Sequence, residues 1–245
     1  MRLPETETAN QRWLQKEVLQ SRLLDDMESG DMESGKQWRA TTWNQGRGSV
    51  EQTADRAHDG RHSLRLQTAT SGTDASADGG VFGTTSALRV FDHEDWREFN
   101  RLSFWVYPDL PGFQAVALSV RLGNDGPRQG RDTHHFLMKN QCWNQIVWEF
   151  PDVARDRVTE LAFTYVLNGH EPGAAETALF DIDQVELQTV HADHYEGWNV
   201  APGQIAFSHT GYPTHGPKFA LASDLQARQF RLIAETTGEV AYEAP

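Results

Sequence analysis

The chain has 245 residues, of which 38% are hydrophobic and 10% aromatic, and it carries a net charge of −13 at pH 7. This length and composition indicate a folded protein of one or two domains and exclude a largely disordered chain. The negative charge would repel a nucleic-acid backbone or an anionic membrane, so we expect neither as a partner. A single cysteine, Cys142, excludes an intrachain disulfide and a cysteine-built zinc site.

The first segment has the pattern of a helix. Within residues 10–24, apolar side chains recur at roughly helical spacing among good helix formers, at Trp13, Leu14, Val18 and Leu23. The pattern predicts a short amphipathic helix and a helical arm over residues 1–21. The pentapeptide DMESG then occurs twice, at 26–30 and 31–35. We interpret the second copy as an insertion in a surface turn, which loop entropy tolerates.

After Gly35 the sequence is typical of an all-β sandwich, with short runs rich in Val, Ile, Thr, Phe and Trp between turn residues. Most runs alternate with period two; Leu102, Phe104 and Val106 share one face, for example, and Trp105 and Tyr107 share the other. The predicted strands are 63–69, 101–108, 115–123, 134–139, 143–150, 160–167 and 178–188.

A break in this pattern follows the last of these strands. Residues 191–204 have no periodicity and mix polar, aromatic, Pro and Gly residues, as an inter-domain linker does. Residues 205–245 return to strand-like sequence but are short for an independent sandwich of about 100 residues. We expect an incomplete second domain there.

Motifs for catalysis are absent: there is no nucleophile elbow, phosphate-binding loop, zinc-protease helix or dinucleotide fingerprint. Sugar binding needs flat aromatic faces flanked by polar side chains. Outward aromatics and nearby polar residues of the predicted strands are candidates for such a surface, although each also fits an ordinary core or surface position: Trp105, Tyr107, Arg121, His134 and Glu149.

Carboxylates are candidates for a calcium site. Glu28, Asp59 and Asp183 lie near the first strand, in an Asp-Gly turn and in the last strand, and an antiparallel sandwich can bring these places together. Calcium prefers six to eight hard oxygen ligands. Solvated carboxylates and turn-forming Asp residues explain the same pattern.

Five segments, taken in order, resemble the galactose-binding-like β-jelly-roll modules attached to bacterial polysaccharide-degrading enzymes. They are LLDDMESG, AHDGRHSLRL, NRLSFWVYPD, a W-x-x-I-x-W-x-F run from Trp143, and LFDIDQVEL, and the match spans residues 22–190. The resemblance implies a jelly-roll fold and carbohydrate binding. It also implies a structural calcium ion framed by Glu28, Asp59 and Asp183.

The C-terminal stretch, IAFSHTGYPTHGPKFALAS, looks like the opening of the immunoglobulin-like domain that precedes the catalytic barrel in glycoside hydrolase family 9. Gly216-Pro217-Lys218 fits that family's pattern, whereas Ser208-His209 replaces its Asn-Gln pair. The resemblance implies that the chain is the non-catalytic N-terminal part of a larger glycoside hydrolase with a catalytic domain downstream, or a natural fragment of one. It also implies a secreted, periplasmic or cell-surface location. No catalytic residue transfers to this chain.

Three functions follow from these patterns. The first is a carbohydrate-binding accessory module for polysaccharides or oligosaccharides. The second is a structural spacer that packs against the catalytic barrel, and the third is a glycoside hydrolase in its own right.

Overall fold

A computed structural model of the chain describes residues 13–29, 38–72, 82–112, 115–125, 130–168, 175–192, 200, 203, 205–208, 211–223, 226–227 and 229–244. The chain divides into two units, Met1–Ala192 and Asp193–Pro245. The second copy of DMESG lies outside the described residues.

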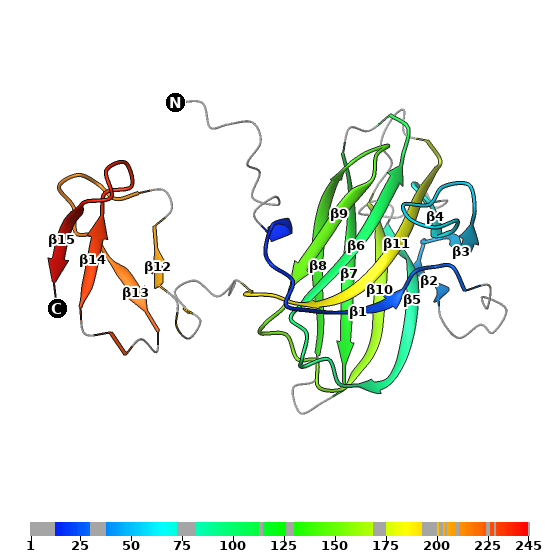
Figure 1. The fold of residues 1–245 in the computed structure, drawn as a ribbon. Helices are drawn as coiled ribbons and strands as arrows, with labels where there is room; N and C mark the ends of the chain where they lie inside the picture. Colours follow the sequence, from blue (N-terminus) through cyan, green and yellow to red (C-terminus); the bar gives the residue numbers. More distant parts are fainter. Residues whose placement is uncertain are drawn as a thin grey trace. The chain divides into compact units, whose positions relative to one another are not determined.

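The first unit contains two antiparallel sheets that form a β-sandwich (Figure 1). The six-stranded sheet runs in the order β3 (Gly48–Thr53), β4 (Ser63–Ala69), β11 (Thr177–Thr189), β6 (Arg101–Asp109) and β9 (Asn144–Glu149), with β1 (Gln20–Asp25) also paired to β11. The five-stranded sheet runs in the order β2 (Trp38–Asn44), β5 (Phe82–Glu94), β10 (Val158–Asn168), β7 (Ala115–Asn124) and β8 (Gly130–Lys139). An all-β jelly-roll sandwich is therefore the fold of this unit.

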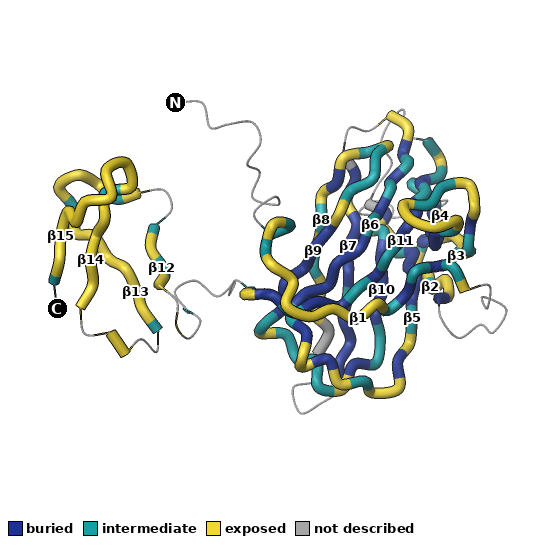
Figure 2. Tube along the Cα trace, viewed as in Figure 1, coloured by how far each residue is buried: buried dark blue, intermediate teal, exposed yellow. Residues whose placement is uncertain are grey.

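The core lies between the two sheets, and period-two alternation decides which side chains enter it. Leu102, Phe104 and Val106 of β6 are all buried, as the alternation predicts. They meet residues of the facing sheet such as Phe163, whose ring centroid lies 4.9 Å from that of Phe104. The buried positions follow the strands through the centre of the unit (Figure 2).

All seven strands predicted from the sequence are confirmed, with ends that differ by a few residues. The prediction missed β1, β2, β3 and β5. Of the missed strands, β5 matters most for the topology, because it pairs with both β2 and β10 and so joins β2 to the rest of the five-stranded sheet.

The predicted N-terminal helix is wrong. Residues 1–12 lie outside the described residues, and of the remainder only Trp13 and Leu14 are helical. Residues 20–25 form β1 instead, paired with β11 from Gln20↔Thr189 to Asp25↔Val185. The apolar spacing suggested a helix. Strand β4, however, pairs with β11 only from Thr177 to Ile182, and the next part of the same edge of β11 pairs with β1.

The second unit contains two hairpins, β12 (Ile205–Phe207) with β13 (Ala220–Ala222), and β14 (Phe230–Ile233) with β15 (Val240–Ala244). None of its described residues is buried. On the second hairpin Phe230, Leu232 and Tyr242 point to one face and the Arg231–Glu243 ion pair to the other. Nowhere in the described part of the chain is a helix long and apolar enough to cross a membrane.

Candidate functional site

The five residues predicted to bind sugar lie in three separate places. Trp105, Tyr107 and Glu149 belong to the outer side of the six-stranded sheet, since Glu149 pairs with Arg101 in the same register. Arg121 lies on the outer side of the five-stranded sheet. His134 lies between the sheets. They form no single surface, and their sugar-binding role stays a prediction.

Trp105 and Tyr107 hold the loop of residues 54–62. The His58 ring stacks on Trp105 with centroids 3.7 Å apart, and the Arg56 guanidinium lies 3.9 Å from the centroid of the Tyr107 ring. Trp143 packs edge-on beside His58 and Tyr107. One face of each ring is thus taken by the protein itself, where a sugar would otherwise stack.

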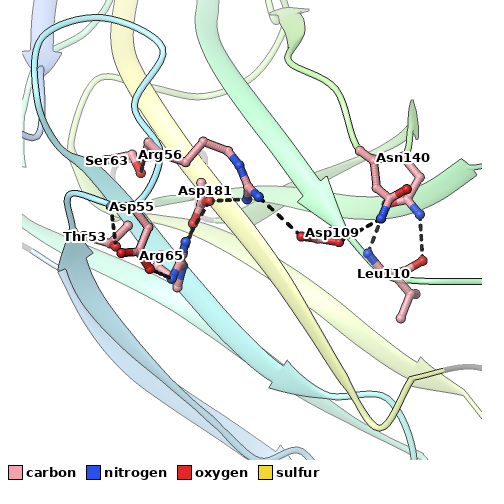
Figure 3. Close-up of polar contacts among 10 residues, drawn as sticks. Thr53, Asp55, Arg56, Ser63, Arg65, Asp109, Leu110, Asn140 and Asp181 are labelled. Carbon is pink, nitrogen blue, oxygen red and sulfur yellow. Dashed lines mark hydrogen bonds and ion pairs between the residues drawn. The ribbon is translucent and has the colours of Figure 1, made fainter.

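A buried carboxylate anchors the same loop (Figure 3). Asp181 is fully buried and accepts hydrogen bonds from Arg56 Nη1 at 2.7 Å and from Arg65 Nε at 2.8 Å. The hydrogen bonds to Asp181 raise the pKa of Arg65 above its ordinary value. Arg56 also reaches Asp109 and Arg65 reaches Asp55. This cluster ties the 54–62 loop to strands β4, β6 and β11 of the six-stranded sheet.

The side chains of His134 and Glu149 both contact other side chains of the protein. The His134 ring lies nearly parallel to Trp148, with centroids 5.9 Å apart, and burial lowers the pKa of the imidazole. Glu149 pairs with Lys16 Nζ at 2.8 Å. The backbone carbonyl of Trp13 accepts a bond from Arg101, so residues 13–16 cover this end of the sheet.

Glu28 and Asp183 also bind the 54–62 loop, through its amides. Asp183 Oδ2 accepts from the backbone N–H groups of His58 and Asp59 at 2.8 and 3.1 Å. Glu28 Oε1 accepts from Arg61 and His62, both at 2.7 Å, and these bonds lower the pKa of Glu28. Gly60, between the amides that bind Asp183 and those that bind Glu28, has φ +69°, a value that favours glycine. A Cβ there would lie 2.5 Å from Glu28 Oε1, so a side chain at this position would push the Glu28 carboxylate away from its two amides.

In this structure the three carboxylates of the predicted calcium site serve the protein's own amides. Glu28 Oε1 and both oxygens of Asp183 accept backbone N–H groups, and Asp59 uses Oδ1 for the N–H of Gly60. Across the described ranges, no three His, Cys, Asp or Glu side chains converge as metal ligands. The calcium site of Glu28, Asp59 and Asp183 therefore stays a prediction.

Thermal melts test the calcium prediction. Because amides already occupy the Glu28 and Asp183 oxygens, we expect the same Tm in millimolar calcium and in excess EDTA. Glu28→Gln serves as the matched variant. A calcium-dependent rise in Tm that Glu28→Gln abolishes would establish the site instead.

The outer face of the five-stranded sheet carries a row of polar side chains, one from each strand. Strand register places Thr41, Ser86, Thr164, Ser119 and His135 side by side across the sheet. Ser86 Oγ and Thr164 Oγ1 are 2.8 Å apart, and Ser119 Oγ lies 2.7 Å from His135 Nδ1. We call these five residues the hydroxyl row.

Aromatic side chains lie at one edge of the same face. Trp43 of β2 is 59% exposed and contacts Phe82 edge-to-face, with centroids 6.3 Å apart. Trp43 pairs with Thr84, two residues along the strands from the Thr41–Ser86 pair of the hydroxyl row. On the other side of that row Arg121 forms an ion pair with Glu160 at 3.2 Å. Ser86, Thr164 and Ser119 of the row are buried, so the exposed groups of this face are the indole on β2, the half-buried threonines Thr41 and Thr84 near it, and the imidazole of His135 on β8. An indole flanked by hydroxyl groups suits a flat, polar ligand.

The sequence prediction missed this face. Trp43 and Phe82 lie on strands that were not predicted. His135 was passed over for His134, although alternation with the buried Met138 places His134 inside and His135 outside.

Comparison with known proteins identifies the fold of the first unit. No family model matches the chain, and no curated protein matches it. A solved structure of a family 11 carbohydrate-binding module from Clostridium thermocellum, in complex with a β-1,3-1,4-mixed-linked tetrasaccharide, aligns over 69% of this chain and 96% of its own, with a TM-score of 0.51 and 12% identity. The first unit shares its fold with carbohydrate-binding modules.

The family 22 xylan-binding domain from Paenibacillus barcinonensis aligns over 73% of this chain and 97% of its own, with a TM-score of 0.41 and 14% identity. The likeness to the family 11 module, at 12% identity, concerns the fold alone.

Proposed function

We propose that the first unit is a non-catalytic carbohydrate-binding module and that the outer face of its five-stranded sheet binds the glycan. The observation that carries this proposal is the exposed Trp43 in register beside the hydroxyl row. The indole offers a flat apolar surface to the C–H face of a sugar ring, and the half-buried Thr41 and Thr84 beside it offer partners to the sugar hydroxyl groups. The exposed His135 lies at the far end of the row, whereas Ser86, Ser119 and Thr164 are buried and bond within the sheet. The tetrasaccharide bound to the family 11 module supports the choice of ligand class.

We propose that the module serves a secreted or cell-surface glycoside hydrolase, which it would concentrate on a polysaccharide by added valency. The second unit would then be the start of an immunoglobulin-like domain leading to a catalytic domain downstream. Support comes from the sequence resemblance and from the two hairpins, which expose apolar residues on every strand.

Trp43→Ala tests the function directly. We expect it to weaken glycan binding at least tenfold, because truncated aromatic anchors commonly cost 2 kcal/mol or more and about 1.4 kcal/mol is tenfold. Affinity electrophoresis on mixed-linked β-glucan and xylan, followed by calorimetry with oligosaccharides of the polymer that binds, measures the change.

Trp105→Ala is the matched control on the other sheet. Because Trp105 holds His58 and its loop, we expect a lower Tm and unchanged affinity. A loss of affinity in Trp105→Ala with none in Trp43→Ala would move the site to the six-stranded sheet. Wild-type protein that binds no glycan would favour the structural-spacer function.

A further inference from the structure

The five-stranded sheet divides at one end. Strands β10 and β7 pair from Val158↔Asn124 to Thr164↔Ser119, and among the described residues no pairing joins them beyond that point. Both strands nevertheless continue: β7 stays paired with β8 as far as Ala115, and β10 with β5 as far as Asn168. We call the space between residues 115–118 and 165–168 the fork. The strands on its two sides present edge-like rows of backbone N–H and C=O groups.

A cavity of about 200 Å³ lies in the fork. Its lining comes from both sides of the division and from the end of β6: Leu110, Val116, Ala117, Ser119, His135, Tyr165 and Val166. Pockets for drug-sized ligands run from about 300 to 1,000 Å³, and a water occupies about 30 Å³. The cavity therefore has room for one small ring but not for several.

The lining combines apolar and hydrogen-bonding groups. His135 uses Nδ1 toward Ser119, and its Nε2 has no protein partner among the described residues. Tyr165 supplies a half-buried aromatic ring, which packs against Phe180, and a hydroxyl with no hydrogen-bond partner in the described part of the chain. Burial raises the pKa of this phenol, so it stays a neutral donor. Apolar walls with a few polar groups match a ring that has C–H faces and a hydroxylated rim.

The fork continues into the proposed glycan face. Trp43 pairs with Thr84 and Thr84 with Val166, so the indole and the wall of the cavity belong to one lateral row. Adjacent strands lie about 4.8 Å apart, which puts β2 roughly 9.6 Å from β10. A ligand that extends from the cavity toward β2 thus crosses β10 and β5 before it reaches Trp43.

We infer that the fork holds the terminal ring of a bound oligosaccharide, with the following rings extending over Thr84 to Trp43. The inference rests on the proposed carbohydrate-binding function and adds a specificity to it. Because the cavity holds one ring and the last strand pair, Thr164↔Ser119, closes its inner end, a chain enters with its end and not with its middle.

Filling the fork tests the inference. Ala117→Phe places a bulky side chain at an exposed strand position in the cavity wall, where Phe is well tolerated. Ser49→Phe, at an exposed position of β3 in the other sheet, is the matched control. We expect Ala117→Phe to weaken binding of a linear tetrasaccharide more than tenfold with Tm unchanged, and Ser49→Phe to leave both unchanged. Tyr165→Phe, which keeps the ring, should weaken binding about fivefold through one lost hydrogen bond.

The second arm varies the ligand. Calorimetry compares three forms of the tetrasaccharide from the polymer that binds: the free sugar, the form reduced to an alditol, and the form with a bulky acetal on the non-reducing ring. We expect blocking of one end to abolish binding and blocking of the other to leave it intact. If both blocked forms bind like the free sugar and Ala117→Phe has no effect while Trp43→Ala does, the fork inference fails and the glycan-binding function stands. If no form binds the wild-type protein, both fail.

Discussion

Replacing Asp181 with asparagine is expected to lower the free energy of unfolding by about 3 to 5 kcal/mol, the cost of breaking a buried ion pair on one side. The carboxylate is fully buried and accepts hydrogen bonds from both Arg56 and Arg65. Asparagine keeps the volume but removes the charge, so both guanidinium groups lose their buried partner and keep only the more exposed carboxylates of Asp109 and Asp55. Urea denaturation of the whole chain measures the difference.

Asp55→Asn is the control for this change. Asp55 pairs with the same Arg65 at 2.6 Å, but its side chain is 74% exposed. Solvent screens such a pair, and we expect a loss below about 1 kcal/mol. Equal losses from the two substitutions would show that burial of Asp181 does not set the strength of the cluster.

Alternation predicted the fold well because it reports a local property of each strand. Residues such as Leu102 and Phe104 enter the core whichever strands surround them, and so the all-β sandwich could be predicted from the sequence alone. The same rule failed at residues 20–25. These residues form a strand because they pair with an edge of β11 that is more than 150 residues away in sequence, and no local pattern contains that information.

The candidate site was harder to predict for the same physical reason. Its main features depend on which strands are neighbours: the hydroxyl row exists because five strands align in register, and the fork exists because two of them separate. Conversely, Trp105 and Tyr107 have the composition of a sugar-binding surface, yet His58 and Arg56 from a distant loop cover one face of each ring. Residue type alone does not distinguish an aromatic that binds a ligand from one that binds its own protein.

Replacing Phe163 with alanine is expected to cost about 3 to 5 kcal/mol of stability, the usual range for a buried Phe reduced to Ala. Phe163 is fully buried at the middle of β10, where its ring stacks on Trp38 with centroids 5.3 Å apart and meets Phe104 of the facing sheet. Neighbours from both sheets are too rigid to close the space that the ring would leave. Denaturant unfolding followed by tryptophan fluorescence measures the loss.

The matched control is Phe82→Ala, a substitution of the same type in the adjacent strand β5. Phe82 is 44% exposed and contacts only Trp43 among the aromatic rings of the described residues, so we expect a loss within about 1 kcal/mol. The pair separates two roles within one sheet: Phe163 joins the two layers, whereas Phe82 belongs to the outer face that we assign to ligand binding. If Phe82→Ala destabilised the protein as much as Phe163→Ala, the outer face would be part of the structural core, and the assignment of a binding role to it would lose its basis.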